Sequence, residues 1–284
     1  MAMSHDGKEK WKKNLGPYVS QHSAGPSPII YGDLVILVNS QDRDGGGQST
    51  ILAVNRLTGD EVWSLPRPST TVPYSTPCLR KTSDGKDELI INESNQGMEA
   101  IDPLTGKVNW EIPSLIDKRS VSSPVITAGG LITISCGSGG GGNFLVAVHP
   151  KGKGEPMGGE VAFKVDKNGP YVPTPVAYKN WLFLISDGGI AICVDVKTGQ
   201  VVWQKRVGGT FYSSIVCVDG KLYCTSTDGE VIVLAATDTY ELLARNPLGE
   251  TSHSTPAVAG GRLYLRTVNH LMCVGGEKPK LAAK

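Results

Sequence analysis

Residues 100–110 read "AIDPLTGKVNW", and two close variants of this phrase occur elsewhere in the chain. Residues 53–63 read "AVNRLTGDEVW", and residues 193–203 read "CVDVKTGQVVW". Each copy has an apolar pair, a Thr-Gly turn, and a Trp four residues after the Gly. Because glycine reaches the positive φ of a tight turn without a steric penalty, each phrase predicts two strands joined by a turn.

A second pattern precedes each phrase. It is a small group of Ser, Thr or Pro followed by an apolar segment, a turn and another apolar segment, as in "SSPVITAGGLITI" at residues 122–134. The third residues of these groups are Pro28, Pro77, Pro124, Pro175, Ile215 and Pro256. Their spacings are 49, 47, 51, 40 and 41 residues. Four short strands repeated at this period are typical of propeller blades.

We therefore predict an all-β fold, a six-bladed β-propeller of four-stranded antiparallel blades in a single domain over residues 1–284. The predicted blades cover residues 20–66, 70–113, 118–165, 170–207, 210–247, and 251–275 together with 3–16. The last blade lacks an apolar fourth strand of its own, and residues 4–16, "SHDGKEKWKKNLG", would supply it. Such pairing removes an open strand edge. The alternative is a piece of a longer propeller whose ends do not meet.

The aromatic residue of each phrase is predicted to cover the gap between neighbouring blades, burying roughly 150–250 Å² of apolar surface. These structural docking positions are Trp11, Trp63, Trp110, Phe163 and Trp203. The fifth blade has Tyr240 in place of the Gly and Ala244 in place of the Trp. One contact between blades is therefore expected to be weak.

The composition narrows the classes of partner. The chain has 28 Lys and Arg against 27 Asp and Glu, so no net field favours nucleic acid or an anionic membrane. No apolar run reaches the roughly 18 residues that cross a bilayer. The first residues lack the apolar core of a signal peptide, which predicts a cytoplasmic protein or one whose leader has been removed. The six cysteines form no C-x-x-C pair and are expected to be mostly buried free thiols.

The repeated "A-x-D-x-x-T-G-x-x-x-W" phrase resembles that of the PQQ-like β-propeller repeat family, and the resemblance covers residues 3–275. That family mixes quinoprotein dehydrogenases, an outer-membrane assembly lipoprotein and propellers of unassigned role. The dehydrogenases resemble one another in having eight blades, a vicinal Cys-Cys pair and an acidic calcium site. This sequence has six phases and no Cys-Cys. No cofactor is predicted, and PQQ with calcium is kept as an alternative. The resemblance favours an exported, periplasmic bacterial protein.

The loops that enter the first strand of each blade are predicted to line the mouth of the central channel. They carry His22, Tyr74, Arg119, Tyr171, Tyr212 and His253. We expect these side chains to bind a protein or a small polar or sugar-like ligand. In the alternative, the Tyr rings fill blade junctions and the His residues cap loops. If His22 and His253 converge, they would bind a metal or act in acid–base chemistry.

Two further motifs partly match known ligand-binding sequences. Asp42 and Asp44 in "SQDRDGGGQ", residues 40–48, resemble half of a calcium loop but lack the downstream acidic ligand. The glycines at 137, 139 and 142 are followed by a predicted strand rather than a helix, which excludes a dinucleotide site. The favoured function is a non-catalytic binding scaffold with no confident catalytic residue. The alternatives are a PQQ-dependent dehydrogenase relative and a carbohydrate-active lyase or hydrolase that uses the rim His, Tyr and Arg.

Overall fold

The computed structural model describes residues 1–284 except 43–45, 68–70, 96, 151–157 and 277–284. The described residues contain strands and turns and no helix. The chain divides into two compact units. Unit 1 is Met1–Tyr171 with Lys197–Gly199, and unit 2 is Val172–Val196 with Gln200–Lys284.

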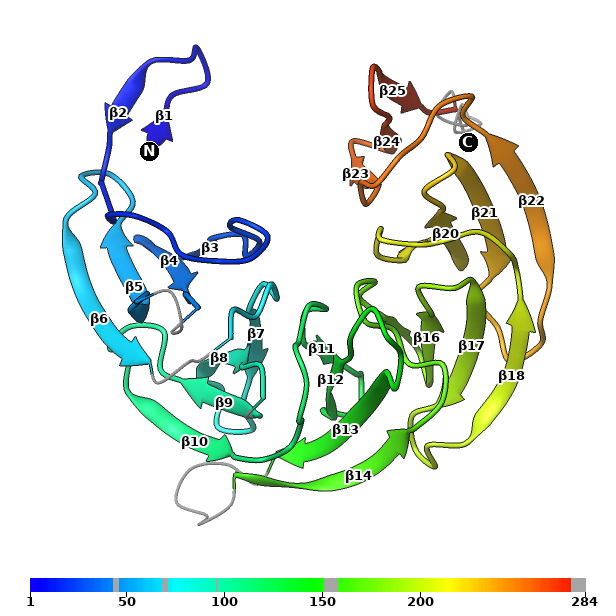
Figure 1. The fold of residues 1–284 in the computed structure, drawn as a ribbon, viewed down its shortest axis with the longest axis horizontal. Helices are drawn as coiled ribbons and strands as arrows, with labels where there is room; N and C mark the ends of the chain where they lie inside the picture. Colours follow the sequence, from blue (N-terminus) through cyan, green and yellow to red (C-terminus); the bar gives the residue numbers. More distant parts are fainter. Residues whose placement is uncertain (43–45, 68–70, 96, 151–157, 277–284) are drawn as a thin grey trace, which may run out of the picture. The chain divides into compact units, whose positions relative to one another are not determined.

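Unit 1 contains three four-stranded antiparallel sheets and one two-stranded sheet among its described residues (Figure 1). The first sheet consists of β3 (Ile29–Tyr31), β4 (Leu34–Asn39), β5 (Ser49–Asn55) and β6 (Glu61–Arg67). The second consists of β7 (Cys78–Lys81), β8 (Asp87–Asn92), β9 (Met98–Ile101) and β10 (Val108–Ile112). The third consists of β11 (Val125–Ile126), β12 (Ile132–Cys136), β13 (Phe144–Pro150) and β14 (Gly159–Val165). The short strands β1 (Ala2–Met3) and β2 (Glu9–Trp11) pair with each other.

Unit 2 repeats the same arrangement. One sheet consists of β15 (Val176–Tyr178), β16 (Trp181–Ile185), β17 (Ile190–Asp195) and β18 (Val201–Arg206). The next consists of β19 (Val216–Val218), β20 (Lys221–Thr225), β21 (Glu230–Ala235) and β22 (Leu242–Pro247). The last described sheet has three strands, β23 (Ala257–Ala259), β24 (Arg262–Arg266) and β25 (Leu271–Val274). Each sheet is a simple meander, in agreement with the predicted four-strand repeat. The total of six blades stays a prediction.

The cores lie between consecutive sheets, because the middle strands are apolar on both faces. In β8, Leu89 and Ile91 join a cluster with Ile36 and Ile51 of the first sheet. Their neighbour Ile90 belongs to a different cluster, which it shares with residues of the third sheet. Successive side chains of a strand point to opposite faces, so one strand contributes to two cores. This arrangement explains why these strands are nearly continuous apolar runs.

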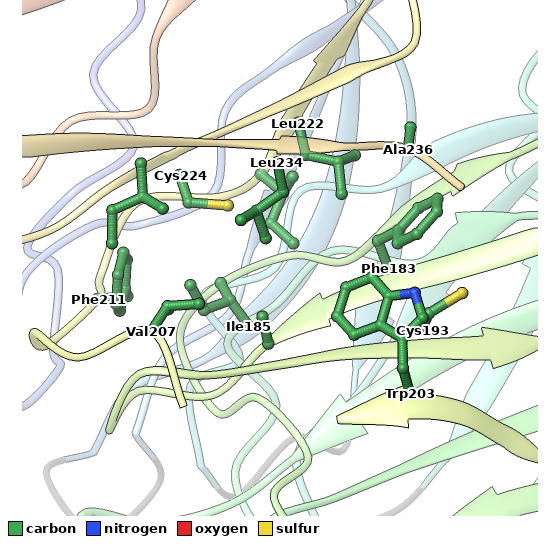
Figure 2. Close-up of a cluster of buried hydrophobic side chains, with 13 residues drawn as sticks. Phe183, Ile185, Cys193, Trp203, Val207, Phe211, Leu222, Cys224, Leu234 and Ala236 are labelled. Atoms are coloured by element: carbon green, nitrogen blue, oxygen red, sulfur yellow. The ribbon is translucent and has the colours of Figure 1, made fainter. Parts of the chain in front are cut away.

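Unit 2 has an equivalent core between its first two sheets. Phe183, Cys193 and Trp203 pack with Leu222 and Leu234, as Figure 2 shows. The Phe183 and Trp203 rings are tilted, with centroids 6.0 Å apart. Consecutive sheets of this unit are therefore joined by close packing of large side chains.

The Thr-Gly turn and the aromatic residue interlock from sheet to sheet. The turn glycines Gly59 and Gly106 have φ values of 78° and 71°. A Cβ on Gly59 would lie 2.7 Å from the Trp11 ring, and one on Gly106 would lie 2.5 Å from the Trp63 ring. Glycine is thus needed both for the turn and for the close approach of the indole.

The third and fourth docking positions show the same close approach of an aromatic ring to a glycine. A Cβ on Gly158 would lie 2.6 Å from the Trp110 ring. Phe163 lies against Gly199, whose turn belongs to unit 1, with 2.4 Å between the Phe ring and an added Cβ. Each aromatic residue is next to a recurrent irregularity of register, for example between Ala53 and Val54 opposite Trp63. Such a bulge strengthens the local twist and redirects the ring.

Tyr240 replaces the glycine in the fifth phrase, and its ring meets Trp203 edge to face with centroids 5.4 Å apart. The contact between Trp203 and the turn that carries Tyr240 is therefore a packed pair of aromatic rings, and not the weak contact that the missing glycine predicted. The other deviation, Ala244, presents no ring from β22 and packs beside the small cluster of Val231, Val233 and Leu265. The weak contact between sheets is thus expected only at Ala244, where β22 has no aromatic side chain.

The Ser/Thr-Pro groups also have a structural meaning. The backbone N–H of Ser27 donates to Thr76 Oγ1 at 3.0 Å, and that of Thr76 donates to Ser123 Oγ at 3.0 Å. In unit 2, the N–H of Ser214 donates to Thr255 Oγ1 at 2.9 Å. Each bond joins equivalent residues of consecutive sheets.

Candidate functional site in the strand-entry loops

The candidate site of unit 1 is built by loops that precede β3, β7 and β11. The His22 and Tyr74 rings lie 5.9 Å apart, and the Tyr74 hydroxyl accepts the backbone N–H of His22 at 3.1 Å. The Arg119 guanidinium lies over the Tyr74 ring at 5.6 Å from its centroid. Two predicted residues, His22 and Arg119, therefore converge on the ring of a third, Tyr74, and the three come from three separate loops. A cation placed over an aromatic face is stabilised electrostatically.

Arg119 is also held at its polar end. Its Nη1 donates to Gln21 Oε1 at 3.0 Å. Its Nε atom is buried and has no hydrogen-bond partner among the described residues. The guanidinium is thus oriented by an amide and a ring, and no carboxylate of the described residues forms an ion pair with it. This leaves its charge available to a ligand.

A cavity of about 530 Å³ opens beside this group. It is lined by Gln21, His22, Thr71, Asn95, Asp117, Lys118, Arg119, Gly137, Ser138, Gly139 and Tyr171. Two of these side chains are cationic and one is anionic. The Lys118 ammonium donates to the carbonyl oxygens of Gly141 and Gly142 at 3.2 and 2.7 Å. The lining therefore carries a net positive charge next to aromatic and amide groups, a surface suited to a carboxylate.

Asp42 holds the loop that carries His22. Its carboxylate accepts the backbone N–H of Gln21 at 2.9 Å and that of Val72 at 3.0 Å. These bonds use both carboxylate oxygens and connect two of the loops. Asp44, the second predicted calcium ligand, lies outside the described residues. In the described part of the chain, no three His, Cys, Asp or Glu side chains are grouped to hold a metal ion.

Glycine permits the close packing of this rim. A Cβ on Gly25 would lie 2.5 Å from Tyr74 Cδ1, and a Cβ on Gly137 would lie 3.0 Å from Tyr171 Cβ. The Tyr74 ring therefore rests directly on the backbone of Gly25, and the Cβ of Tyr171 lies close to Gly137. The Tyr residues were predicted either to bind a ligand or to fill junctions between blades. Both roles are compatible at Tyr74, because it fills a junction between loops and also supports Arg119 and His22.

The other two predicted residues lie in unit 2. Tyr212 and His253 meet edge to face, with ring centroids 5.4 Å apart, and both are exposed. They form a second pair of rings on strand-entry loops. Whether His22 and His253 share a ligand stays a prediction, since they belong to different units.

Sequence reasoning missed Gln21, Lys118 and the positioning role of Asp42. Gln21 and Lys118 each precede a predicted residue, His22 and Arg119, so the loop motif pointed to their neighbourhood without distinguishing them. Most cysteines are buried or half-buried as expected, whereas Cys273 on β25 is exposed. None of the described residues forms a helix with the length and hydrophobicity of a membrane span.

The repeated sheets and the Gly–aromatic contacts define a PQQ-like β-propeller repeat protein. A family model described as "Outer membrane protein assembly factor BamB" matches residues 1–205 and 157–268. These matches cover most of the chain, and the chain belongs to this family.

Two curated relatives carry the same description. The protein from Yersinia pestis is 22% identical over 286 residues, covering 94% of this chain and 68% of its own length. The protein from Moranella endobia (strain PCIT) is 22% identical over 241 residues, covering 81% of this chain and 58% of its own length. Both relatives contain sequence beyond the part that aligns with this chain.

Solved structures show the same fold at low identity. BamB from Moraxella catarrhalis has a TM-score of 0.53 and 13% identity, covering 88% of this chain and 96% of that chain. Quinohemoprotein alcohol dehydrogenase from Comamonas testosteroni has a TM-score of 0.60 and 12% identity, covering 87% of this chain and 52% of that chain. At these identities the likeness concerns the fold alone and not the activity.

Proposed function

We propose that this chain is a non-catalytic propeller scaffold that binds a protein partner through the cavity beside Arg119. The observation that carries the proposal is the oriented guanidinium at the rim of that cavity, held by Tyr74 and Gln21 without an ion pair in the described residues. A positively charged, partly aromatic rim favours an acidic side chain or a chain-terminal carboxylate of the partner. Membership of a family described as an outer membrane protein assembly factor supports a protein partner and an extracytoplasmic location.

Fluorescence anisotropy with a labelled peptide rich in Glu tests this function, and a labelled peptide rich in Gln of the same length serves as the uncharged control. We expect the protein to bind the acidic peptide more tightly, and Arg119→Gln to weaken this binding about tenfold. Arg56→Gln is the matched control, because Arg56 is an exposed arginine paired with Asp33 at 3.0 Å, away from the cavity. Equal binding of both peptides, or equal effects of both substitutions, would overturn the proposal.

The enzymatic alternative has a separate test. If the chain acted as a quinoprotein-type enzyme, PQQ with calcium would raise its melting temperature by mass action. The scaffold function predicts no shift with PQQ and calcium at concentrations that saturate known quinoprotein sites.

The scaffold that we propose is a six-bladed propeller in which β2 becomes the fourth strand beside β25. Among the described residues, β25 pairs only with β24, and its side chains Leu271 and Val274 are 72% and 56% exposed. An apolar edge strand is a site for further strand pairing. Closure would give the edge a partner and repeat the Ser/Thr hydrogen bond from Thr255 to Ser27. The competing occupant of this edge is additional chain of the kind present in the longer relatives.

A further inference from the structure

A second cavity of unit 1, of about 600 Å³, lies at the opposite edge of the second sheet. The rim cavity involves the loops entering β7 and β11, whereas this cavity lies at the β7–β8 hairpin and the β9–β10 turn. In an antiparallel meander these two sets of loops lie at opposite ends of the strands. Its lining residues are Tyr31, Arg80, Thr82–Glu88, Asp102–Leu104, Asn109 and Pro150.

The β7–β8 hairpin forms one wall of this cavity. Five residues separate β7 from β8, whereas two residues separate β3 from β4. The longer turn stands beside Leu104, which is 59% exposed, and Tyr31, whose hydroxyl donates to Asp87 Oδ2 at 3.1 Å. The cavity thus arises where the second sheet departs from the first, and it combines apolar surface with carboxylates.

The floor of the cavity is a buried carboxylate. Glu88 accepts Trp110 Nε1 at 3.1 Å and Asn109 Nδ2 at 3.1 Å. Other docking tryptophans donate instead to a backbone carbonyl of the next sheet, as Trp63 does to Pro103 at 3.2 Å. Trp110 and Glu88 therefore form a fixed base that has no equivalent at Trp11, Trp63 or Trp203, which donate to backbone carbonyls.

The charges of the lining do not balance. Three of its four carboxylates are paired: Asp84 with Lys86 at 2.9 Å, Asp87 with Lys81 at 3.0 Å, and Glu88 with Arg80 at 3.0 Å. The fourth, Asp102, forms no ion pair with the described residues. Its Oδ1 accepts the backbone N–H groups of Leu104 and Thr105 at 2.8 and 3.2 Å, which fixes the carboxylate at the cavity wall. One negative charge remains beside the apolar surface of Tyr31 and Leu104.

We infer that this cavity binds a lysine or arginine side chain of a protein partner. The cationic head pairs with Asp102 within reach of the neighbouring carboxylates, and the aliphatic stem packs on Tyr31 and Leu104. Long cationic side chains bury their methylene stems on apolar surface while the head keeps polar contacts. The unpaired charge selects the sign of the ligand, and the cavity volume admits one such side chain with its peptide backbone.

The first sheet shows that an Asn can replace Asp102 and keep the conformation of the β9–β10 turn. Asn55 occupies the equivalent position of the first sheet, and its Oδ1 accepts the N–H groups of Leu57 and Thr58 at 2.8 and 3.3 Å. Asp102→Asn therefore removes the charge and keeps the same side-chain-to-backbone turn. Asp33→Asn is the matched control, because it neutralises an exposed carboxylate on the corresponding hairpin of the first sheet.

The test is a titration of ¹⁵N-labelled protein with N-acetyl-arginine methylamide, and with the uncharged citrulline analogue, followed by backbone amide shifts. We expect the arginine probe to shift residues 82–87 and 102–104, and the citrulline probe to bind at least about fivefold more weakly. Asp102→Asn should weaken arginine binding by about fivefold, the range of a partly exposed ion pair, and Asp33→Asn should leave it unchanged. Equal binding of both probes, or equal affinity of Asp102→Asn and the unchanged protein, would overturn the assignment.

Discussion

The backbone N–H of Thr76 donates a 3.0 Å hydrogen bond to Oγ of Ser123, the equivalent residue of the next sheet. Unit 2 repeats this relationship, since the N–H of Thr174 donates to Ser214 Oγ at 3.1 Å. The proline that follows Thr76 favours an extended backbone there and brings no N–H of its own. The Ser/Thr-Pro group is thus a hydrogen-bonded connection between sheets, placed directly beside the loops of the candidate site.

Thr76 offers a conservative test of this connection. Thr76→Val removes the hydroxyl that accepts the N–H of Ser27, at 3.0 Å, and keeps the shape of the side chain. We expect a loss of about 1 kcal/mol in the free energy of unfolding, measured by urea denaturation. Thr76→Ser keeps the acceptor and should cost less. A larger cost for Ser than for Val would contradict the role of the hydroxyl.

Gly106 and Gly130 separate the two demands on a turn glycine. Both have positive φ, 71° and 81°, but an added Cβ meets the Trp63 ring at 2.5 Å only at Gly106. Nothing lies within 4 Å of the position at Gly130. We expect Gly130→Ala to cost about 1 kcal/mol from backbone strain, and Gly106→Ala to cost about 1–3 kcal/mol more from displacement of the indole. Equal costs in urea denaturation would show that Trp63 does not rest on the turn.

Glu99 predicts a pH dependence of stability. Burial raises the pKa of this carboxyl, while Arg67, which forms ion pairs with Glu99 and Glu93, opposes the rise. A raised folded-state pKa means that the native protein holds the proton more tightly than the unfolded chain does. The contribution of Glu99 is then greatest below its unfolded-state pKa and is lost as the pH rises through its folded-state pKa.

The measurement compares the unchanged protein with Glu99→Gln, which cannot ionise. We expect the free energy of unfolding of the unchanged protein, relative to Glu99→Gln, to decrease as the pH rises from about 4, near the ordinary pKa of a Glu, to neutral pH. An increase over this range would mean that pairing with Arg67 outweighs burial.

The buried thiols predict a pattern of chemical labelling. Burial raises the pKa of Cys78, Cys193 and Cys224 to about 12 and that of Cys136 to about 11. Because the thiolate is the reactive form, these four cysteines should resist maleimide near neutral pH in the native protein and react after unfolding in urea. Peptide mass mapping locates each label. Rapid native labelling of Cys193 would contradict its position beneath Trp203.

The sequence predicted the strand repeat because its period depends on local features: Thr-Gly turns, alternating apolar segments and an aromatic residue at fixed spacing. It also indicated the rim loops, since a repeat fixes which loops share one end of the sheets. It did not distinguish Gln21, whose loop is held by Asp42, or Lys118, whose ammonium donates to the carbonyl oxygens of Gly141 and Gly142. The cavity beside Asp102 was not predicted, because it depends on the β7–β8 hairpin and on Trp110 donating to Glu88. Each of these features is a departure from the repeat, which a repeat-based argument does not specify.

The register of the other sheets defines the proposed closure residue by residue. In the sheet β15–β18, Cys193 lies opposite Trp203 and Ala191 lies opposite Lys205. Cys273 pairs with Tyr264 as Cys193 pairs with Phe183, so the two cysteines occupy equivalent positions. The proposed closure would therefore place Trp11 opposite Cys273 and Lys13 opposite Leu271.

The most direct test is disulfide formation in Lys13→Cys/Leu271→Cys under mild oxidation, read by peptide mass mapping without reduction. Residues directly opposite in an antiparallel pair lie within the Cα separation that a disulfide bridges, ~4.4–6.8 Å. The account predicts a 13–271 disulfide in high yield, and little disulfide in Lys12→Cys/Leu271→Cys, where the side chains point to opposite faces. Absence of the 13–271 disulfide, or equal yields in the two variants, would contradict the closure of the propeller by β2.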